Sequence, residues 1–213
     1  DDPDTTGTQS YAVADIHALI DTAGFTGKVT ATVTEVTADA LTNATTGVTG
    51  TGHSLTITMT DASATATELS FISAATILPV TLDPAGDAIT GVESSTYATA
   101  LALFQDSAGF TGLSASTVIV SDAITVAQAN ALDALTTGAI TATISDQALS
   151  VLGGLTGTGN VYTTTVQDTT VAAADINALC AKITKANGVT MSAAGTVTGS
   201  LADLNTLYVT NAA

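Results

Sequence analysis

Arginine and tryptophan are absent from this chain of 213 residues, and lysine occurs only as Lys28, Lys182 and Lys185. The 19 acidic residues leave a net charge of −16, which repels nucleic acid and acidic membranes and excludes both as expected partners. No apolar run approaches the roughly 20 residues that span a bilayer, so we expect no membrane insertion. Since only 10% of the residues are charged, the chain is a folded protein and not a disordered acidic tail.

Cysteine is almost absent too, because Cys180 is the only one. The chain therefore forms no internal disulfide, and its cysteine content does not distinguish an oxidising compartment from a reducing one. The thiol lies in the helical pattern AADINALCAKI, where we expect a buried apolar residue rather than a reactive group. The chain begins at Asp1 without methionine, so we expect a processed form or a part of a longer polypeptide.

The most informative feature that is present is an internal recurrence. Six times, a run that alternates apolar residues with threonine ends on a carboxylate, and a short alanine-rich helical pattern follows. Most of the steps between these terminal acids fit a strand-plus-helix unit of about 20–30 residues. The runs are VTATVTE (29–35), LTITMTD (55–61), ILPVTLD (77–83), STVIVSD (116–122), ITATISD (140–146) and TTTVQD (163–168).

The helical patterns carry Leu and Ile at three- and four-residue spacing, which gives each helix one narrow apolar stripe. Thr65 with Glu68, Thr125 with Gln128 and Ser200 with Asp203 fit the spacing of capping residues at helix starts. The expected helices cover residues 11–20, 37–45, 65–73, 96–105, 125–135, 147–155, 171–183 and 200–208.

Repeated strand-then-helix order predicts parallel strands with right-handed crossovers. We therefore expect an α/β fold, a repetitive strand-plus-short-helix solenoid with a parallel sheet. The expected domain is single and covers residues 1–213, with about seven strand–helix units and a loop insertion near 84–95. The alternative is two β-rich sandwich-like domains, in which the alanine-rich runs are not helices.

Stacked units would align the terminal acids near one edge, where neighbouring carboxylates repel by about 1 kcal/mol per pair in water. Two arrangements relieve this repulsion. The carboxylates accept backbone N–H hydrogen bonds at turns and helix starts, or they bind a cation, for which calcium is the candidate cofactor. The candidate calcium ligands are Glu35, Asp61, Asp83, Asp122, Asp146 and Asp168.

Alternation along the strands places apolar side chains on one face and threonines on the other. The threonine face is explained by strand propensity alone, by packing against another copy, or by binding of an ordered surface such as ice. Ile119, Val161 and Pro79 interrupt the array, which counts against an ice plane. The candidate surface-binding residues are Thr30, Thr32, Thr56, Thr58, Thr141 and Thr143.

No catalytic signature is present, and we expect that the protein is not an enzyme. The only histidines are His17, in a helical pattern, and His53, which follows a TGTG turn and is expected in an exposed loop. Two separated histidines and one cysteine do not give the ligand spacing of a zinc site. The glycine-rich runs at 47–52 and 154–159 lie after a helix and before a strand, the reverse of a phosphate-binding loop.

Residues 124–146, ITVAQANALDALTTGAITATISD, and VAAADINALCAKI followed by GSLADLNTLY resemble the repeats of long Ala/Thr-rich surface and adhesin-like proteins of bacteria, cyanobacteria among them. The resemblance covers about half of the chain, mainly residues 113–208. It implies an exported, structural or adhesive cell-surface protein, a segment or subunit of a filament, surface layer or matrix that associates with other copies. The alternative function is a calcium-dependent or ice-binding module.

Overall fold

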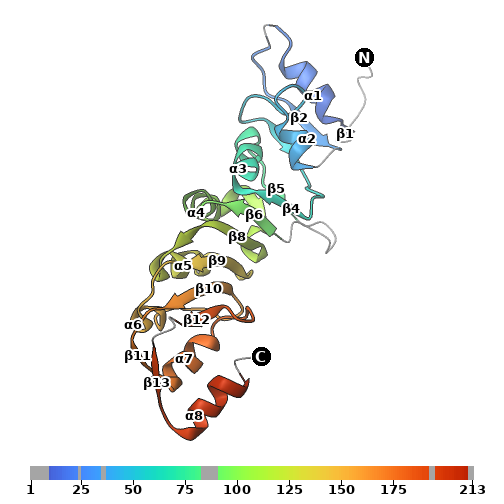
Figure 1. Ribbon diagram of the computed structural model, residues 1–213. Coiled ribbons are helices and arrows are strands. Elements are labelled where there is room, and N and C mark those ends of the chain that lie inside the picture. The colour runs from blue at the N-terminus through green and yellow to red at the C-terminus, as the bar shows by residue number, and fades with distance from the viewer. Residues whose placement is uncertain (1–9, 24, 35–36, 83–90, 192–194, 211–213) are drawn as a thin grey trace. The chain divides into compact units, whose positions relative to one another are not determined.

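The computed structural model describes residues 10–23, 25–34, 37–82, 91–191 and 195–210. The chain divides into two compact units, one of residues 1–95 and 99–116 and one of residues 96–98 and 117–213. Figure 1 shows strands alternating with short helices along the chain within each unit. Each unit is therefore of mixed α/β type, as the order of sequence patterns predicts.

The first unit contains three groups of parallel strands. Its sheets have the orders β1-β2-β3 and β5-β7, and β4 pairs with β6. The strands are β1 (Ser10–Tyr11), β2 (Thr30–Val33), β3 (Ser54–Thr56), β4 (Ser63–Thr65), β5 (Val80–Thr81), β6 (Gly91–Ser95) and β7 (Phe110–Thr111). Its helices are α1 (Val13–Ile20), α2 (Ala38–Thr42), α3 (Ala66–Ala75) and α4 (Tyr97–Gln105), of which residues 97–98 group with the second unit.

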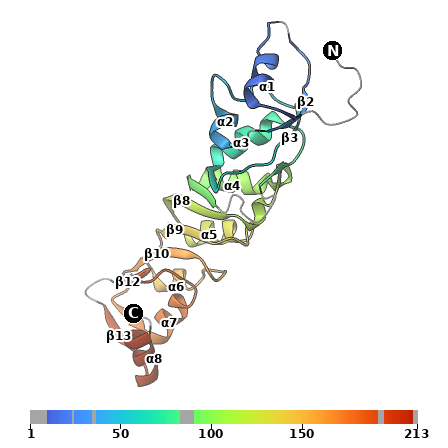
Figure 2. The ribbon, with the colours of Figure 1, turned by 90° about the vertical axis from the view of Figure 1, so that its right-hand side faces the viewer.

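The second unit contains four parallel strands in the order β8-β9-β10-β12, and a separate parallel pair, β11-β13. Figure 2 shows β8, β9 and β10 in succession, with α5 and α6 along one side. The strands are β8 (Thr117–Ile124), β9 (Ile140–Ile144), β10 (Val161–Val166), β11 (Thr170–Ala172), β12 (Val189–Met191) and β13 (Thr196–Thr198). The helices are α5 (Val126–Asp133), α6 (Leu149–Leu152), α7 (Ala173–Cys180) and α8 (Leu201–Asn205), which continues as a π-helical turn over Thr206–Thr210.

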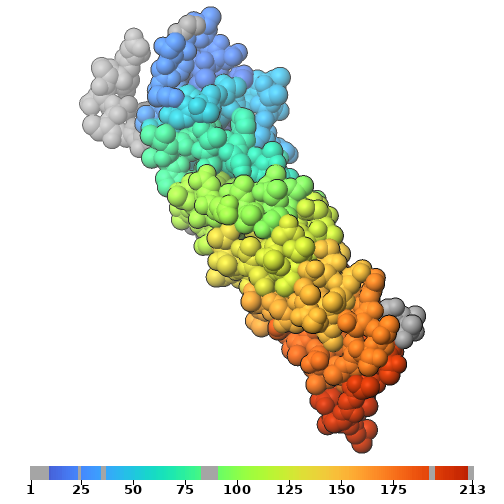
Figure 3. Space-filling model, turned by 90° about the vertical axis from the view of Figure 1, so that its left-hand side faces the viewer, coloured from blue at the N-terminus to red at the C-terminus, as the bar shows by residue number. Residues whose placement is uncertain are grey.

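The core of each unit comes from the alternation that the sequence shows. In β9, Ile140, Ala142 and Ile144 are buried, whereas Thr141 and Thr143 lie on the opposite, more exposed face. Each helix adds a stripe of Leu, Ile and Ala to the same interior, as Leu132 of α5 and Leu152 of α6 do. Figure 3 shows residues of the second unit in successive bands along the chain, so that consecutive strand–helix segments lie next to one another.

All eight expected helices are present, with ends that differ by a few residues from the patterns. Thr65 with Glu68 and Thr125 with Gln128 form complete capping boxes, and the Ser200 hydroxyl accepts from the Asp203 N–H. The two-sandwich alternative is wrong for the described residues, because the alanine-rich runs are helical and every described strand pair is parallel. Of the expected insertion near 84–95, Gly91–Ser95 form β6, and residues 84–90 lie outside the described part.

Candidate functional site

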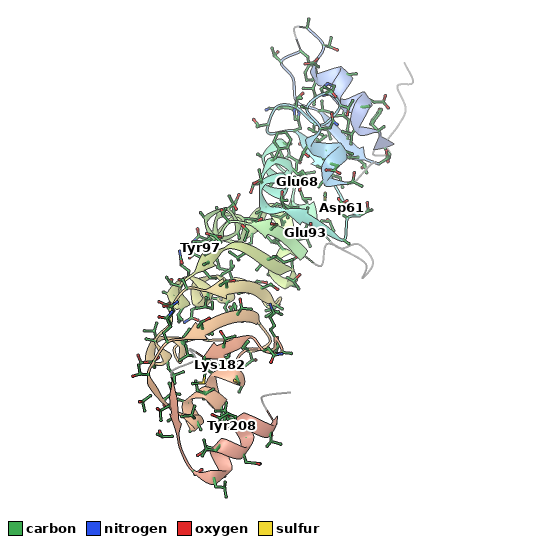
Figure 4. All side chains as sticks on the ribbon, viewed as in Figure 1. Asp61, Glu68, Glu93, Tyr97, Lys182 and Tyr208 are labelled. Carbon is green, nitrogen blue, oxygen red and sulfur yellow. The ribbon has the colours of Figure 1, made fainter. Side chains whose placement is uncertain are left out.

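Four of the recurring carboxylates make the same contact. Each accepts a hydrogen bond from the first backbone N–H of the preceding helix, 19 to 25 residues earlier in the chain. Figure 4 labels Asp61 in the first unit and Tyr97, the amide partner of Asp122, in the second. The contacts are Asp61 Oδ2 to Ala38 N (2.6 Å), Asp122 Oδ1 to Tyr97 N (2.7 Å), Asp146 Oδ2 to Val126 N (2.6 Å) and Asp168 Oδ2 to Leu149 N (2.7 Å).

Parallel register explains why these acids reach helix starts. Ile144 of β9 pairs with Ile124 of β8, so the chain two residues later brings Asp146 beside Val126, where α5 begins. A helix start carries N–H groups without intrahelical acceptors and the positive end of the helix dipole, so a carboxylate is favoured there. Each acid is thus paired with a separate helix start. These contacts offset the electrostatic repulsion that we expect between neighbouring carboxylates.

The capping arrangement is therefore observed for Asp61, Asp122, Asp146 and Asp168, while Glu35 and Asp83 lie outside the described residues. The start of α3 has a different acceptor, since the buried Ser95 hydroxyl takes the Ala66 N–H at 2.9 Å. Sequence reasoning missed Ser95 because it searched for acids. Its signal is a small hydroxyl residue at the end of a strand that precedes a helix.

The described residues contain no group of three or more His, Cys, Asp or Glu side chains that could hold a metal ion. The four described acids are spread over the starts of α2, α4, α5 and α6, and each uses a carboxylate oxygen for a backbone amide. The four candidate calcium ligands that are described therefore have backbone hydrogen-bond partners, and their carboxylates do not converge on one point.

A second set of contacts lies inside the protein, at the starts of strands. His53, Thr76 and Asn160 are 3%, 7% and 2% exposed, and each accepts a hydrogen bond from the backbone of the preceding strand–helix segment. His53 is therefore buried, and the prediction of an exposed loop residue is wrong. The acceptors are His53 Nδ1 for Val29 N (3.2 Å), Thr76 Oγ1 for Leu55 N (3.0 Å) and Asn160 Oδ1 for Ile140 N (2.8 Å).

The two TGTG runs explain the position of two of these residues. Their glycines adopt positive φ angles, 76° and 72° at Gly50 and Gly52, and 74° and 93° at Gly157 and Gly159. Such angles disfavour other residues, so the turns need glycine. Each turn delivers the next side chain, His53 or Asn160, into the interior. The glycine-rich runs are thus structural turns before buried capping residues.

A third set of contacts starts from the fifth residue of a helix. The Asn130 side chain donates to the Gly154 carbonyl at 2.8 Å, and the Asn177 side chain donates to the Asp203 carbonyl at 3.0 Å. His17 occupies the same position in α1, and its Nδ1 lies 2.7 Å from the Gly47 carbonyl. These three side chains tie a helix to the segment that follows it, which gives His17 a structural partner.

The threonine face contains hydroxyl pairs across neighbouring strands. Thr143 Oγ1 lies 3.1 Å from Thr163 Oγ1, and Thr165 Oγ1 lies 2.8 Å from Thr190 Oγ1. A groove of about 410 Å³ in the second unit is lined by these threonines together with Gln147 and Asn187 among others. The other candidates lie on the same face of their strands, with Thr30 beside Ser54, Thr32 beside Thr56, Thr58 beside Thr81 and Thr141 beside Val161.

Among the described residues, two side chains have a clearly shifted pKa, those of Cys180 and Tyr162. Burial raises the pKa of the Cys180 thiol, which lowers the fraction of reactive thiolate. Burial also raises the pKa of Tyr162, and the nearby Asp133 carboxylate adds to the shift. The Tyr162 hydroxyl is the one buried side-chain polar atom without a hydrogen-bond partner in the described part of the chain. Tyr162 lies in the packed interior, whereas Cys180 is half-buried, so the prediction of a buried residue at Cys180 is met only in part.

The contacts above connect one strand–helix segment to the next. Within the described part of the chain, no helix has the length and apolar character needed to cross a bilayer. A search of family models, of curated proteins and of solved structures finds no match to this chain.

Proposed function

We propose that this chain is a structural or adhesive repeat protein of the cell surface or extracellular matrix, in which the strand–helix segments stack as coils of a solenoid. The observation that carries the proposal is the recurring contact of Asp61, Asp122, Asp146 and Asp168 with the helix starts of preceding segments. One contact repeated at successive steps supports a stacked array, because each coil is held mainly by its neighbours.

The lysines support the same role. Lys182, labelled in Figure 4, donates to the carbonyls of Gly153 at 2.7 Å and Leu155 at 2.8 Å, just beyond the end of α6. Lys28 donates to the Thr51 carbonyl in the first TGTG turn. Cations near carbonyls at helix ends and turns are favourable. Two of the three lysines are thus used to hold neighbouring segments together.

The resemblance to Ala/Thr-rich bacterial surface repeats supports an extracellular location, and the net charge of −16 suits a protein that stays soluble in salt. The proposed partners are other copies of the chain, and the proposed product is a filament, layer or matrix. No catalytic residue is part of this proposal.

Electron microscopy of the purified chain, together with sedimentation velocity over a range of concentrations and salt, tests the function. We expect filaments or a lattice, and larger species as concentration rises. A chain that stays monomeric at the highest concentration, in both low and high salt, would contradict the assembly function. Surface labelling of the intact source cells tests location separately, and material found only inside the cells would contradict it.

A second candidate function follows from the paired hydroxyls of Thr143 with Thr163 and of Thr165 with Thr190, which form an ordered patch in the second unit. Such a patch supports binding of an ordered surface such as ice. An ice recrystallisation assay tests it, with Thr143→Val and Thr165→Val as the variants and Thr67→Val, on the exposed face of α3, as the control. Full activity of both second-unit variants would reject this function.

A further inference from the structure

The first helix of the chain has the sequence pattern of an interior helix but not its burial. Helices α1 (VADIHALI) and α7 (AADINALC) share the pattern A-D-I-x-A-L, and Ile16 and Ile176 are both buried in these helices. Leu179 of α7 is 1% exposed, whereas the equivalent Leu19 of α1 is 49% exposed. The N-terminal segment thus exposes an apolar side chain, Leu19, whose equivalent in an interior segment, Leu179, is buried.

The strand before α1 shows the same difference. Tyr11 of β1 pairs in register with the buried Val33 of β2, so its ring lies on the core face. Tyr11 is nevertheless 42% exposed, whereas Val171, at the equivalent position before α7, is buried. Among the described residues, β2 is the one strand that pairs with β1.

The last helix of the second unit, α8, also exposes an apolar side chain at a position that is buried in α7. Helix α8 begins Leu-Ala-Asp-Leu-Asn and continues Thr-Leu, so Leu201 takes the place of Ala173 and Asn205 that of Asn177. Ala173 is fully buried, whereas Leu201 is 86% exposed and no residue of α8 is buried. Strand β13, before α8, has β11 as its one described partner.

Among the described residues, α8 also lacks the two contacts to a following segment that α5 makes. Among the described residues, no carboxylate accepts from the Leu201 N–H, although Val126 and Leu149 each have one. Asn205 carries the same amide as Asn130 and Asn177, which reach carbonyls of the next segment. Tyr208, labelled in Figure 4, adds a 61% exposed ring on the helical turn after α8.

We propose that the N-terminal segment of one copy, with β1 and α1, docks on the C-terminal segment of a second copy, with β13 and α8. This head-to-tail contact rests on the proposed assembly function and gives it a polarity. It continues an interface that the chain already makes between its own segments, with parallel strands and the same helix pattern on the incoming side. A contact between two C-terminal ends would instead need a twofold axis and opposed strands. Because a head-to-tail contact uses two different surfaces, it can join more than two copies and gives the assembly a direction.

Two single-end variants test the polarity. Leu19→Asp places a charge on the N-terminal surface, and Leu201→Asp places one on the C-terminal surface. Val151→Asp is the matched control, since Val151 is 45% exposed on α6, a helix that belongs to neither terminal segment. All three positions are exposed, so we expect the variants to melt like the parent chain. Melting scans confirm that they are folded before assembly is compared.

We expect each end variant to require at least a tenfold higher concentration than the parent for assembly, because a charge would have to be desolvated in the contact. Mixed in equal amounts, the two variants should form a dimer and no larger species. Each variant keeps one unmodified surface, and these two surfaces bind each other. The control should assemble like the parent.

Assembly of the end variants at the parent's concentration, or self-dimerisation of one of them, would overturn the head-to-tail contact and leave the assembly function standing. A parent chain that never assembles would overturn both. Sedimentation velocity separates these outcomes, because it resolves monomer, dimer and polymer.

Discussion

The Asp146 carboxylate accepts the Val126 N–H at 2.6 Å, although 20 residues separate the two positions in the chain. Val126 is the first residue of α5, and Asp146 follows β9, so one hydrogen bond joins two consecutive strand–helix segments. Thr125 already caps the same helix locally through the Gln128 N–H. The remote carboxylate therefore adds a tertiary connection to a helix that has its own local cap.

Replacing Asp146 by Ala should lower the free energy of unfolding by about 1–2 kcal/mol, the usual cost of losing a capping acceptor. Asp146→Asn should lose less, because the amide oxygen still accepts a hydrogen bond. Urea denaturation measures both changes. Asp106→Ala is the control, since the Asp106 side chain makes no capping hydrogen bond and its removal changes the net charge equally. Equal effects at positions 106 and 146 would show that charge, not capping, controls the loss.

Thr76→Val should destabilise the first unit by about 1–3 kcal/mol, because the change leaves buried backbone groups unpaired at nearly constant volume. Thr76 Oγ1 accepts from the Leu55 N–H at 3.0 Å and donates to the Leu55 carbonyl at 2.9 Å. Thr67→Val, on the exposed face of α3, is the matched control and should change stability by less than about 0.5 kcal/mol. Chemical denaturation compares the two variants, and a Thr76→Val protein as stable as its control would contradict the buried contact.

The sequence predicts the helices well, leaves two roles open for the recurring acids, and predicts the buried polar residues poorly. Leu and Ala spacing is a local property, so it identifies helices such as α5 and α7 directly. The acids recur as carboxylates at strand ends, so the sequence shows that they share a position even though it leaves their role open. His53, Thr76 and Asn160 all accept a backbone N–H, but they are three different residue types, so no sequence pattern connects them. In addition, a residue that follows a glycine-rich turn, as His53 and Asn160 do, is normally expected to be exposed. Only the parallel register shows that their side chains face inward.

Tyr162→Phe should leave the free energy of unfolding unchanged or raise it by up to about 1 kcal/mol at neutral pH. The reason is that the buried Tyr162 hydroxyl has no hydrogen-bond partner, so its removal ends a desolvation cost. Tyr97→Phe, at a half-buried site, is the control. Calorimetry and urea titration measure the change, and a loss of more than about 1 kcal/mol would mean that the hydroxyl has a partner.

Calcium should not raise the melting temperature beyond the shift that magnesium produces at the same ionic strength. Asp61, Asp122, Asp146 and Asp168 are each engaged by a backbone amide, and the described residues offer no three-ligand cluster. Ligand binding to the folded state would raise the melting temperature progressively with concentration. A saturable, calcium-specific rise that Asp61→Asn or Asp168→Asn abolishes would establish a cation site and revive the calcium-dependent function.

Alkaline pH should destabilise the protein through Tyr162. The folded-state pKa of Tyr162 is raised by burial and by the Asp133 carboxylate, so the unfolded chain loses this proton first as the pH rises. Ionisation of Tyr162 therefore costs the folded state no stability below about pH 10, the pKa of an unperturbed tyrosine, and costs progressively more as the pH rises above that value. Denaturation midpoints across this range should fall more steeply for the parent than for Tyr162→Phe. Since Tyr97→Phe keeps the buried phenol, it should follow the parent, and identical slopes for all three proteins would contradict the link between Tyr162 burial and alkaline unfolding.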